Sequence, residues 1–256
     1  MVWAKQTFGS GASFGILYFK NSVGLAPKKV TDGGVNGTGL ADDRNGTKSL
    51  QYYDNAGKMP SFGFLNFTTD THFNARGRLG RLVPVLMDLG QPFGFGVDEN
   101  TSLYYDNGVG TVYGWNGVTF ADLTHAVYSP QSYFSIKNVT VHYLTAGDKF
   151  DFNNKRVISS KPVINSPAYT NPTDSSDILS AYEATLLETR VVDQKSLYNL
   201  GRTKTPSGYP RTTPTFELKF YRSASTKGYY GNKHYTAESI LVDFSYGTNS
   251  NNLRVE

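Results

Sequence analysis

Cysteine is absent from the 256 residues of this chain. Its absence excludes disulfide bonds, thiolate nucleophiles and cysteine-based zinc sites. A domain of this length has room for a core that needs no cross-links, so the cellular compartment stays open. The four histidines and the carboxylates do not cluster at the spacing of metal ligands. We therefore expect no metal and no other cofactor.

Charge is sparse as well. Charged residues make up 18% of the chain and the formal net charge is +4, with no basic block beyond R-G-R-L-G-R at residues 76–81. A nucleic-acid partner requires a larger basic patch. No apolar run approaches the roughly 20 residues of a membrane helix. We therefore expect neither a nucleic acid nor a membrane as partner.

Asn-x-Ser/Thr sequons recur along the chain. They favour a secreted glycoprotein, with a cytoplasmic protein as the alternative, because a chain rich in Asn and Thr also forms sequons by chance. No signal peptide is visible at the start, so we expect any signal to lie upstream of this chain. The sequons stand at Asn36, Asn45, Asn66, Asn100 and Asn138.

Abundant Tyr, Phe and Gly favour strands and turns over long helices. Strands are expected at 62–67, 93–97 and 139–144. In residues 76–89 the apolar positions have a helical period, and Pro84 should kink the helix or mark its first turn.

Composition changes after Val157. Residues 159–178 are rich in Ser, Pro, Asn and Thr, as a linker is, and strand-like segments follow them. We divide the chain into a candidate catalytic region, residues 1–157, and a linker with a small β-rich C-terminal extension, residues 158–256.

G-A-S-F-G at residues 11–15 has the G-x-S-x-G pattern of a nucleophile elbow. In that motif glycines permit a sharp turn from strand to helix, which exposes the serine beside an oxyanion-binding backbone N–H. Glycine-rich chains also form the pattern by chance. On the pattern alone, Ser13 is either an activated nucleophile or a small residue in a turn.

A serine nucleophile requires a base. His72 is the candidate, because it ends an expected strand with Asp70 two residues before it, on the same strand face, to orient or flank it. His142 lies within an expected strand and should be packed there, and we expect His234 at the surface.

Three stretches together resemble the cyanophycinases, in the serine peptidase family that also contains aspartyl dipeptidase. D-T-H-F-N-A-R-G-R-L-G-R-L at 70–82 resembles the family's D-x-H-F-x-x-R-G-R-x-G-R-L. The stretch at 94–101 resembles G-I-G-I-D-E-N-T, and that at 141–151 resembles V-H-V-L-T-A-G-D-x-F-D. G-A-S-F-G falls where the family has G-T-S-A-G. The resemblance covers roughly residues 1–157.

This resemblance implies an α/β fold. We expect the second half of a flavodoxin-like, class-I-glutamine-amidotransferase-like three-layer sandwich, followed by the small β-rich C-terminal region. Only about ten residues precede the elbow, whereas the family has several strands and helices there. A parallel sheet that begins at this point would expose an edge and a face. We therefore expect a second polypeptide, or the missing N-terminal half, to complete the sheet in a homo- or hetero-oligomer.

The resemblance also implies the roles of the site residues. Ser13 would be the nucleophile, His72 the general base and Asp32 the acid, in place of the family's glutamate between them. The function implied is hydrolysis of peptide or isopeptide bonds next to aspartate through an acyl-enzyme. The alternative is an inactive relative with a structural or interaction role, which Phe14, Asp32 and the sequons favour.

The arginines of the second motif have two possible roles. Arg76, Arg78 and Arg81, with Asp70, would bind an acidic substrate group, or the arginines would lock the histidine loop through ion pairs. In the second case Asp98 and Glu99 are the expected partners.

Overall fold

The computed structural model describes residues 68–88, 90–129, 134–203 and 215–247, together with the backbone of four short strands nearer the N-terminus. Those four are β1 (Thr7–Gly11), β2 (Phe14–Gly15), β3 (Lys28–Lys29) and β4 (Gln51–Tyr52). β3 and β4 pair only with each other among the described strands.

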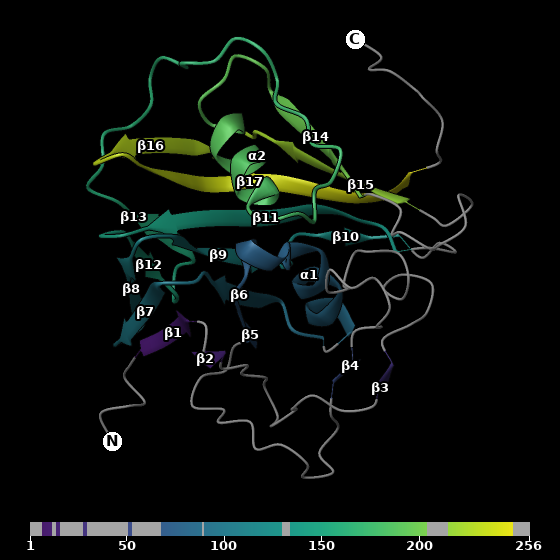
Figure 1. Ribbon diagram of the computed structural model, residues 1–256, viewed down its shortest axis with the longest axis horizontal. Helices are drawn as coiled ribbons and strands as arrows, with labels where there is room; N and C mark the ends of the chain where they lie inside the picture. Colours follow the sequence, from purple (N-terminus) through teal and green to yellow (C-terminus); the bar gives the residue numbers. More distant parts are fainter. Residues whose placement is uncertain are drawn as a thin grey trace.

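The larger sheet has nine strands, and its main path runs β14-β15-β17-β11-β9-β6-β5 (Figure 1). β10 pairs with β11, and β16 pairs with β17. β5 and β6 are parallel, and the other pairs in this sheet are antiparallel. The strands are β5 (Thr68–Thr71), β6 (Phe93–Val97), β9 (Gly117–Asp122), β10 (Val127–Tyr128), β11 (Ile136–Thr145), β14 (Tyr198–Arg202), β15 (Thr215–Tyr221), β16 (Lys227–Gly231) and β17 (His234–Gly247).

A second, six-stranded antiparallel sheet packs on one face of the first. Its order is β13-β12-β8-β7-β1-β2. The added strands are β7 (Thr101–Asp106), β8 (Val109–Gly114), β12 (Lys149–Asp151) and β13 (Arg156–Ile158). Phenylalanines fill the space between the sheets, and the rings of Phe120 and Phe150 stack with centroids 4.1 Å apart. Five phenylalanines lie in this core: Phe93, Phe95, Phe120, Phe150 and Phe152.

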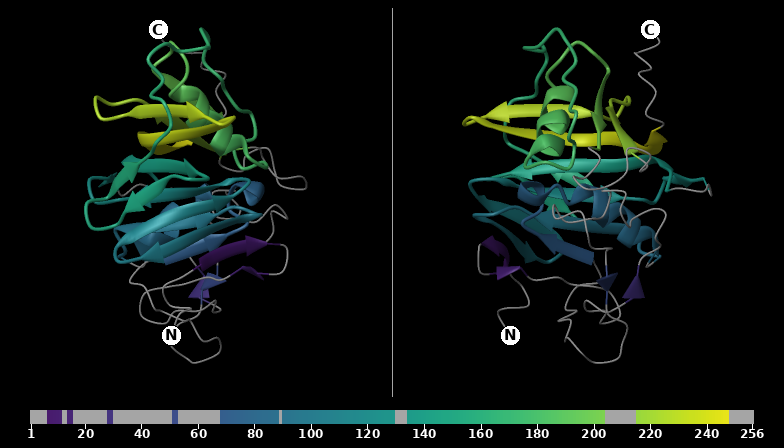
Figure 2. Two further views of the ribbon diagram at one scale, coloured as in Figure 1. Left: turned by 90° about the vertical axis from the view of Figure 1, so that its left-hand side faces the viewer. Right: turned by 45° about the vertical axis from the view of Figure 1, so that its right-hand side comes forward.

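Helices cover the opposite face of the nine-stranded sheet. They are the short 3-10 helix η3 (Asn74–Arg76), α1 (Leu79–Asp88) and α2 (Glu183–Val191). Side chains of β11 alternate between the two layers: Val141 packs in the core under the helices, and Leu144 packs in the core between the sheets. The result is three layers, of helices, sheet and sheet (Figure 2).

The expected α/β class is confirmed, with mixed sheets and few helices. Among the described strands β5–β6 is the only parallel pair, and a second sheet, rather than helices, covers the second face. Strands expected at 93–97 and 139–144 lie in β6 and β11, and the expected helix at 76–89 is α1, which continues through Pro84. The strand expected at 62–67 lies outside the described residues.

The C-terminal region is β-rich, as expected, and its strands continue the sheet begun by the first region. β17 pairs antiparallel with β11 on one side and with β15 on the other. Residues 159–178 contain no helix and only isolated β-bridges. The boundary between residues 157 and 158 stays a prediction, and the strands on its two sides form one continuous sheet.

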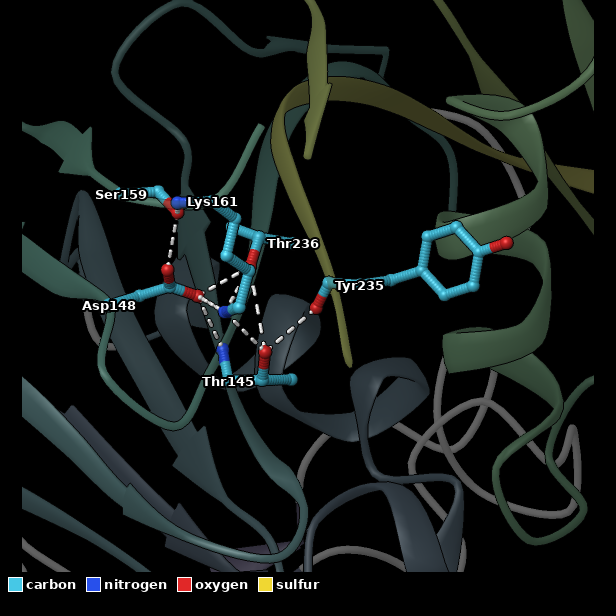
Figure 3. Close-up of polar contacts among 6 residues, drawn as sticks. All are labelled: Thr145, Asp148, Ser159, Lys161, Tyr235 and Thr236. Carbon is cyan, nitrogen blue, oxygen red and sulfur yellow. Dashed lines mark hydrogen bonds and ion pairs between the residues drawn. The ribbon is translucent and has the colours of Figure 1, made fainter. Parts of the chain in front are cut away.

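Lys161 joins the two regions through a buried ion pair (Figure 3). Its ammonium group lies 2.6 Å from Asp148 Oδ2, 2.8 Å from Thr145 Oγ1 and 2.9 Å from Thr236 Oγ1. Asp148 also accepts hydrogen bonds from the hydroxyls of Ser159 and Thr236. All three donors of the lysine are satisfied, so the pair ties β17 to the β11–β12 turn.

We predict that Lys161→Met lowers the free energy of unfolding by about 3 kcal/mol, because it leaves the Asp148 carboxylate buried without its cation. Urea denaturation measures the loss. Lys227→Met, at an exposed position of β16, is the control and should stay close to wild type. A loss as small as that of the control would show that the ion pair does not support the junction.

Candidate active site

His72 lies just after β5, in a turn held against the end of β6. The backbone N–H of Phe73 donates to the carbonyl of Val97 (3.3 Å), and the Phe73 ring is fully buried. That ring occupies the space above Gly96, where a Cβ would lie 1.9 Å from it. Gly96 therefore permits the close packing that sets the position of the histidine.

Asp98, directly after β6, is the hydrogen-bonding centre of this turn. Its side chain is 0% exposed and accepts bonds from Asn74 N (2.8 Å), Asn74 Nδ2 (3.2 Å) and Gly117 N (3.3 Å). Burial raises the pKa of Asp98 to about 6, although these hydrogen bonds lower it. Asp98 thereby joins the histidine turn to the start of β9.

Glu99 brings its carboxylate to the histidine. Glu99 Oε1 lies 2.7 Å from His72 Nδ1, with side-chain exposures of 38% and 15%. The Glu99 carbonyl accepts bonds from Thr101 Oγ1 (3.1 Å) and Asn116 Nδ2 (2.8 Å), which hold its backbone. A carboxylate at Nδ1 fixes the ring and the tautomer in which Nε2 serves as the base. This arrangement has the geometry of the base–acid half of a catalytic triad.

Asp70 pairs with two of the three arginines. Arg81 approaches it in a bidentate manner, with Nε–Oδ2 2.7 Å and Nη2–Oδ1 2.5 Å, and Arg78 Nη1 lies 3.0 Å from Oδ1. Asp70 is 4% exposed. These pairs join β5 to the first turn of α1, so they lock the segment around His72, as one of the two expected roles requires.

The arginine partners expected from the sequence were wrong. Asp98 bonds to Asn74 and Gly117, and Glu99 pairs with His72, while Asp70 pairs with the arginines. Arg76, at the end of η3, is exposed and has no ion-pair partner among the residues that the structure describes.

Ser13, the predicted nucleophile, and Asp32, the predicted acid, lie outside the described residues, and so do Asn36, Asn45 and Asn66. The strands that flank Ser13 are described: Gly11 of β1 pairs antiparallel with Phe14 of β2. The residues that follow the serine thus begin a strand, where an elbow would have a helix.

Those two flanking strands lie near the histidine turn. In β1, Ser10 pairs with Thr101, which is two residues beyond Glu99. β2 is in contact with β5, and His72 directly follows β5. The pairing brings the glycine-rich stretch and the His72–Glu99 pair to the same part of the fold.

A scan against protein-family models finds no match. Two curated relatives are similar to the chain over 96 residues at 28% identity: the cyanophycinases of Trichormus variabilis and of a Nostoc species. The alignment covers 35% of this chain and 32% of each relative. The chain thus spans about a third of the length of the curated relatives that it matches. The similarity indicates a cyanophycinase-like protein at most.

Glu99 is the residue of this candidate site that sequence reasoning missed. It stood in the quoted D-E-N-T stretch, but only as a candidate arginine partner. The sequence contained a signal that could have pointed to Glu99. Glu99 lies shortly after the strand expected at 93–97, and His72 lies at the end of another expected strand. Where two such strands are parallel neighbours, the residues after their carboxyl ends meet at one edge of the sheet. β5 and β6 have this arrangement.

The remaining predicted residues lie on β11 and β17. Asn138 lies at an irregularity of β11, where its side-chain oxygen accepts a bond of 2.7 Å from the Tyr221 hydroxyl, and its glycosylation stays a prediction. His142 is packed, as expected: its Nδ1 accepts from the N–H of Ser239, and burial lowers its pKa to about 4. His234 is half-buried.

Two kinds of feature are absent from the described part of the chain. No helix there is long and apolar enough to cross a membrane. In the same part of the chain no three His, Asp or Glu side chains come together at a metal-binding distance. The expectation of no cofactor stays a prediction.

We predict that the contribution of Asp98 to the free energy of unfolding falls as the pH rises. Its pKa is about 6 when folded and 3.8 in its unperturbed state, so between these values the folded chain keeps a proton that the unfolded chain has released. Its contribution is complete below pH 4 and is lost as the pH rises through 6. The unfolding free energy of wild type relative to Asp98→Asn should fall by roughly 3 kcal/mol at most across this range.

Urea denaturation at several pH values measures this difference. Asn171→Ala, at an exposed position, removes no ionisable group, so it is the control and should show no such trend. A difference between wild type and Asp98→Asn that does not change with pH would contradict the prediction.

Proposed function

We propose that the chain is a cyanophycinase-like serine hydrolase that cleaves peptide or isopeptide bonds next to aspartate. Ser13 is the nucleophile, His72 the general base and Glu99 the acid. The observation that carries the proposal is the 2.7 Å contact between His72 Nδ1 and Glu99 Oε1. The pairing of β1 with β7 and the contact of β2 with β5 support the place of Ser13 near it.

The reaction follows from these roles. His72 Nε2 takes the proton of the Ser13 hydroxyl while the oxygen attacks the amide carbonyl. Glu99, hydrogen-bonded at Nδ1, stabilises the imidazolium that forms. His72 then protonates the leaving amine, and water, activated by the same histidine, releases the acyl group and restores Ser13.

Arg76 is the residue we propose for the acidic group of the substrate. It is exposed, it lies four residues after His72, and its guanidinium is well shaped for a carboxylate. Arg78 and Arg81 already share Asp70, so their part is to hold the segment in place.

The finer fold assignment and the partner are also proposals. β5 ends the path of the nine-stranded sheet in the described part of the chain and is parallel to β6. A further parallel strand on β5 would extend it as in a flavodoxin-like sandwich. We propose that a second polypeptide supplies that strand. Native mass spectrometry tests this, and a folded, monodisperse single chain would contradict it. Secretion and glycosylation remain predictions.

Labelling with a fluorophosphonate probe tests the hydrolase proposal. The complete native assembly should be labelled, and Ser13→Ala should abolish the labelling because the probe reacts with an activated serine. Ser10→Ala, in the same glycine-rich stretch, is the control and should be labelled as wild type. If no labelling depends on Ser13, the inactive relative is the better description.

A second prediction concerns the identity of the acid. Glu99→Gln should lower the labelling rate of Ser13 by roughly 10²-fold or more, because a neutral amide no longer stabilises the imidazolium. Asp32→Asn should leave the rate close to wild type. Labelling time courses measure both rates, and the reverse result would restore Asp32 as the acid.

A further inference from the structure

Trp115 is the most exposed large apolar side chain in the described part of the chain, at 79%. A single exposed apolar residue is ordinary, but two further exposed aromatic residues stand on the strands next to it. They are Tyr113 of β8, which is 55% exposed, and Tyr104 of β7, which is 39% exposed. Exposed aromatic residues that gather in one place are typical of a binding surface.

The register of β7 and β8 places the two tyrosines on one face of the six-stranded sheet. Tyr113 pairs with Ser102, and Tyr104 lies two residues further along β7, so both point to the same side. Leu103 and Val112, at alternate positions, are buried in the core between the sheets, so the side of the tyrosines is the outer one. Diagonal neighbours of this kind are about 7–8 Å apart.

The turn between β8 and β9 fixes Trp115 beside the candidate active site. The N–H of Trp115 donates to the carbonyl of Asn100 (3.0 Å), and Asn116 Nδ2 donates to the carbonyl of Glu99 (2.8 Å). Gly114 has a φ of +120°, and a Cβ on it would lie 2.2 Å from the Asn100 carbonyl oxygen. The backbone of Trp115 is therefore held against the segment that carries Glu99.

These contacts use the backbone of Trp115 and leave its indole in water. An exposed indole forgoes the stabilisation that its burial would give. The fold therefore gains little from this side chain. A ligand that covers the ring would remove apolar surface from water, which is a favourable contribution to binding.

Strand β7 leads from the candidate site to the tyrosines. It begins two residues after Glu99, and Tyr104 lies four residues beyond Asn100, which is about 13 Å along an extended strand. On its other edge β7 pairs with β1, the strand that precedes Ser13. The three rings thus start beside the candidate site and extend away from it for about the length of four extended peptide residues.

The charges around the rings are few and of both signs. Asp106 lies two residues beyond Tyr104 on the same face. Lys149 of β12 pairs with Thr111, which in turn pairs with Tyr104. A charged group on a ligand would meet both an attractive and a repulsive neighbour here, so charge selects neither sign. The ring faces themselves favour apolar groups, and their partial negative charge disfavours carboxylates.

We propose that Trp115, Tyr113 and Tyr104 form an aromatic row that binds the residues of a peptide substrate next to the cleaved bond and selects apolar side chains there. This inference rests on the proposed hydrolase function, in which Arg76 takes the acidic group at the cleaved bond. The substrate is then a peptide of several residues, acidic at the cleaved bond and apolar beyond it. A dipeptide is too short to reach the tyrosines.

The emission of Trp115 tests whether a peptide reaches the aromatic row. The probe is the peptide Leu-Ser-Leu-Asp-Leu-Ser-Leu, and Lys-Ser-Lys-Asp-Lys-Ser-Lys is the matched peptide. Both are added to the complete native assembly with Ser13→Ala, which prevents cleavage. The difference in emission between this assembly and one that also carries Trp115→Phe belongs to Trp115. We expect the leucine peptide to shift it to shorter wavelengths, because the indole leaves water, and the lysine peptide to leave it unchanged.

Peptide affinity measures what each ring contributes. Fluorescence anisotropy of the labelled leucine peptide gives the dissociation constant, again with Ser13→Ala. We expect Trp115→Ala to weaken binding about tenfold and Tyr113→Ala to weaken it several-fold, because aromatic anchors carry much of the affinity of such surfaces. Trp115→Phe keeps a ring and should retain most of the affinity. The thermal unfolding of Trp115→Ala should match that of wild type, because the indole is exposed.

Tyr128→Ala is the matched control. Tyr128 is 47% exposed in β10, which lies on the other side of the molecule from β7 and β8 in Figure 1. This variant also removes an exposed aromatic ring from a strand, and it should bind the leucine peptide as the unsubstituted assembly does.

The outcomes separate this inference from the proposed function. Unchanged affinity in Trp115→Ala overturns the aromatic row, and so does an equal loss in Tyr128→Ala or a failure of the leucine peptide to bind. Tighter binding of the lysine peptide overturns the selection of apolar side chains. A wild-type assembly that the fluorophosphonate does not label at Ser13 overturns the hydrolase proposal. In that case the peptide affinities, which require no cleavage, still decide whether the aromatic row binds peptides.

Discussion

The buried carboxylate of Asp98 is the constraint on which the candidate site depends. A carboxylate that is 0% exposed requires hydrogen-bond donors, because an unpaired buried acid is strongly destabilising. Its donors come from Asn74 in the histidine turn and from Gly117 at the start of β9. Three segments must therefore meet at one point. Once they do, the next residue, Glu99, is placed beside His72.

The nine-stranded sheet has a packed hydrophobic core on each face, and these two cores hold the three segments in place. β5 and β6 run in parallel, so His72 and Asp98 emerge from the same edge. Because glycine has no side chain, the Phe73 ring can lie against the sheet at Gly96. Phenylalanines fill the opposite face of β6. Small and large residues on the two faces of one short strand thus place the turn that carries His72.

The C-terminal region is integrated with the rest of the structure in two ways. β17 extends the sheet through β11, and Lys161 places a buried charge at the junction. On the helical side the residues before α2 pack against the histidine turn. A stretch rich in Ser, Pro and Asn resembles a linker because it lies at the surface, and surface position does not imply that the two regions fold separately.

The sequence by itself determined the local elements. The apolar period of α1, the strands β6 and β11 and the candidate base His72 are all visible in short windows, because helix and strand periods reflect which face of an element is buried. Only the tertiary structure decided the second sheet, the pairing of β11 with β17, the partner of the arginines and the contact of Glu99 with His72. Each of these depends on contacts between residues far apart in the chain, which local propensity does not encode. A carboxylate such as Asp70 or Glu99 takes the partner that packing brings within hydrogen-bonding distance, and that distance exists only in the folded chain.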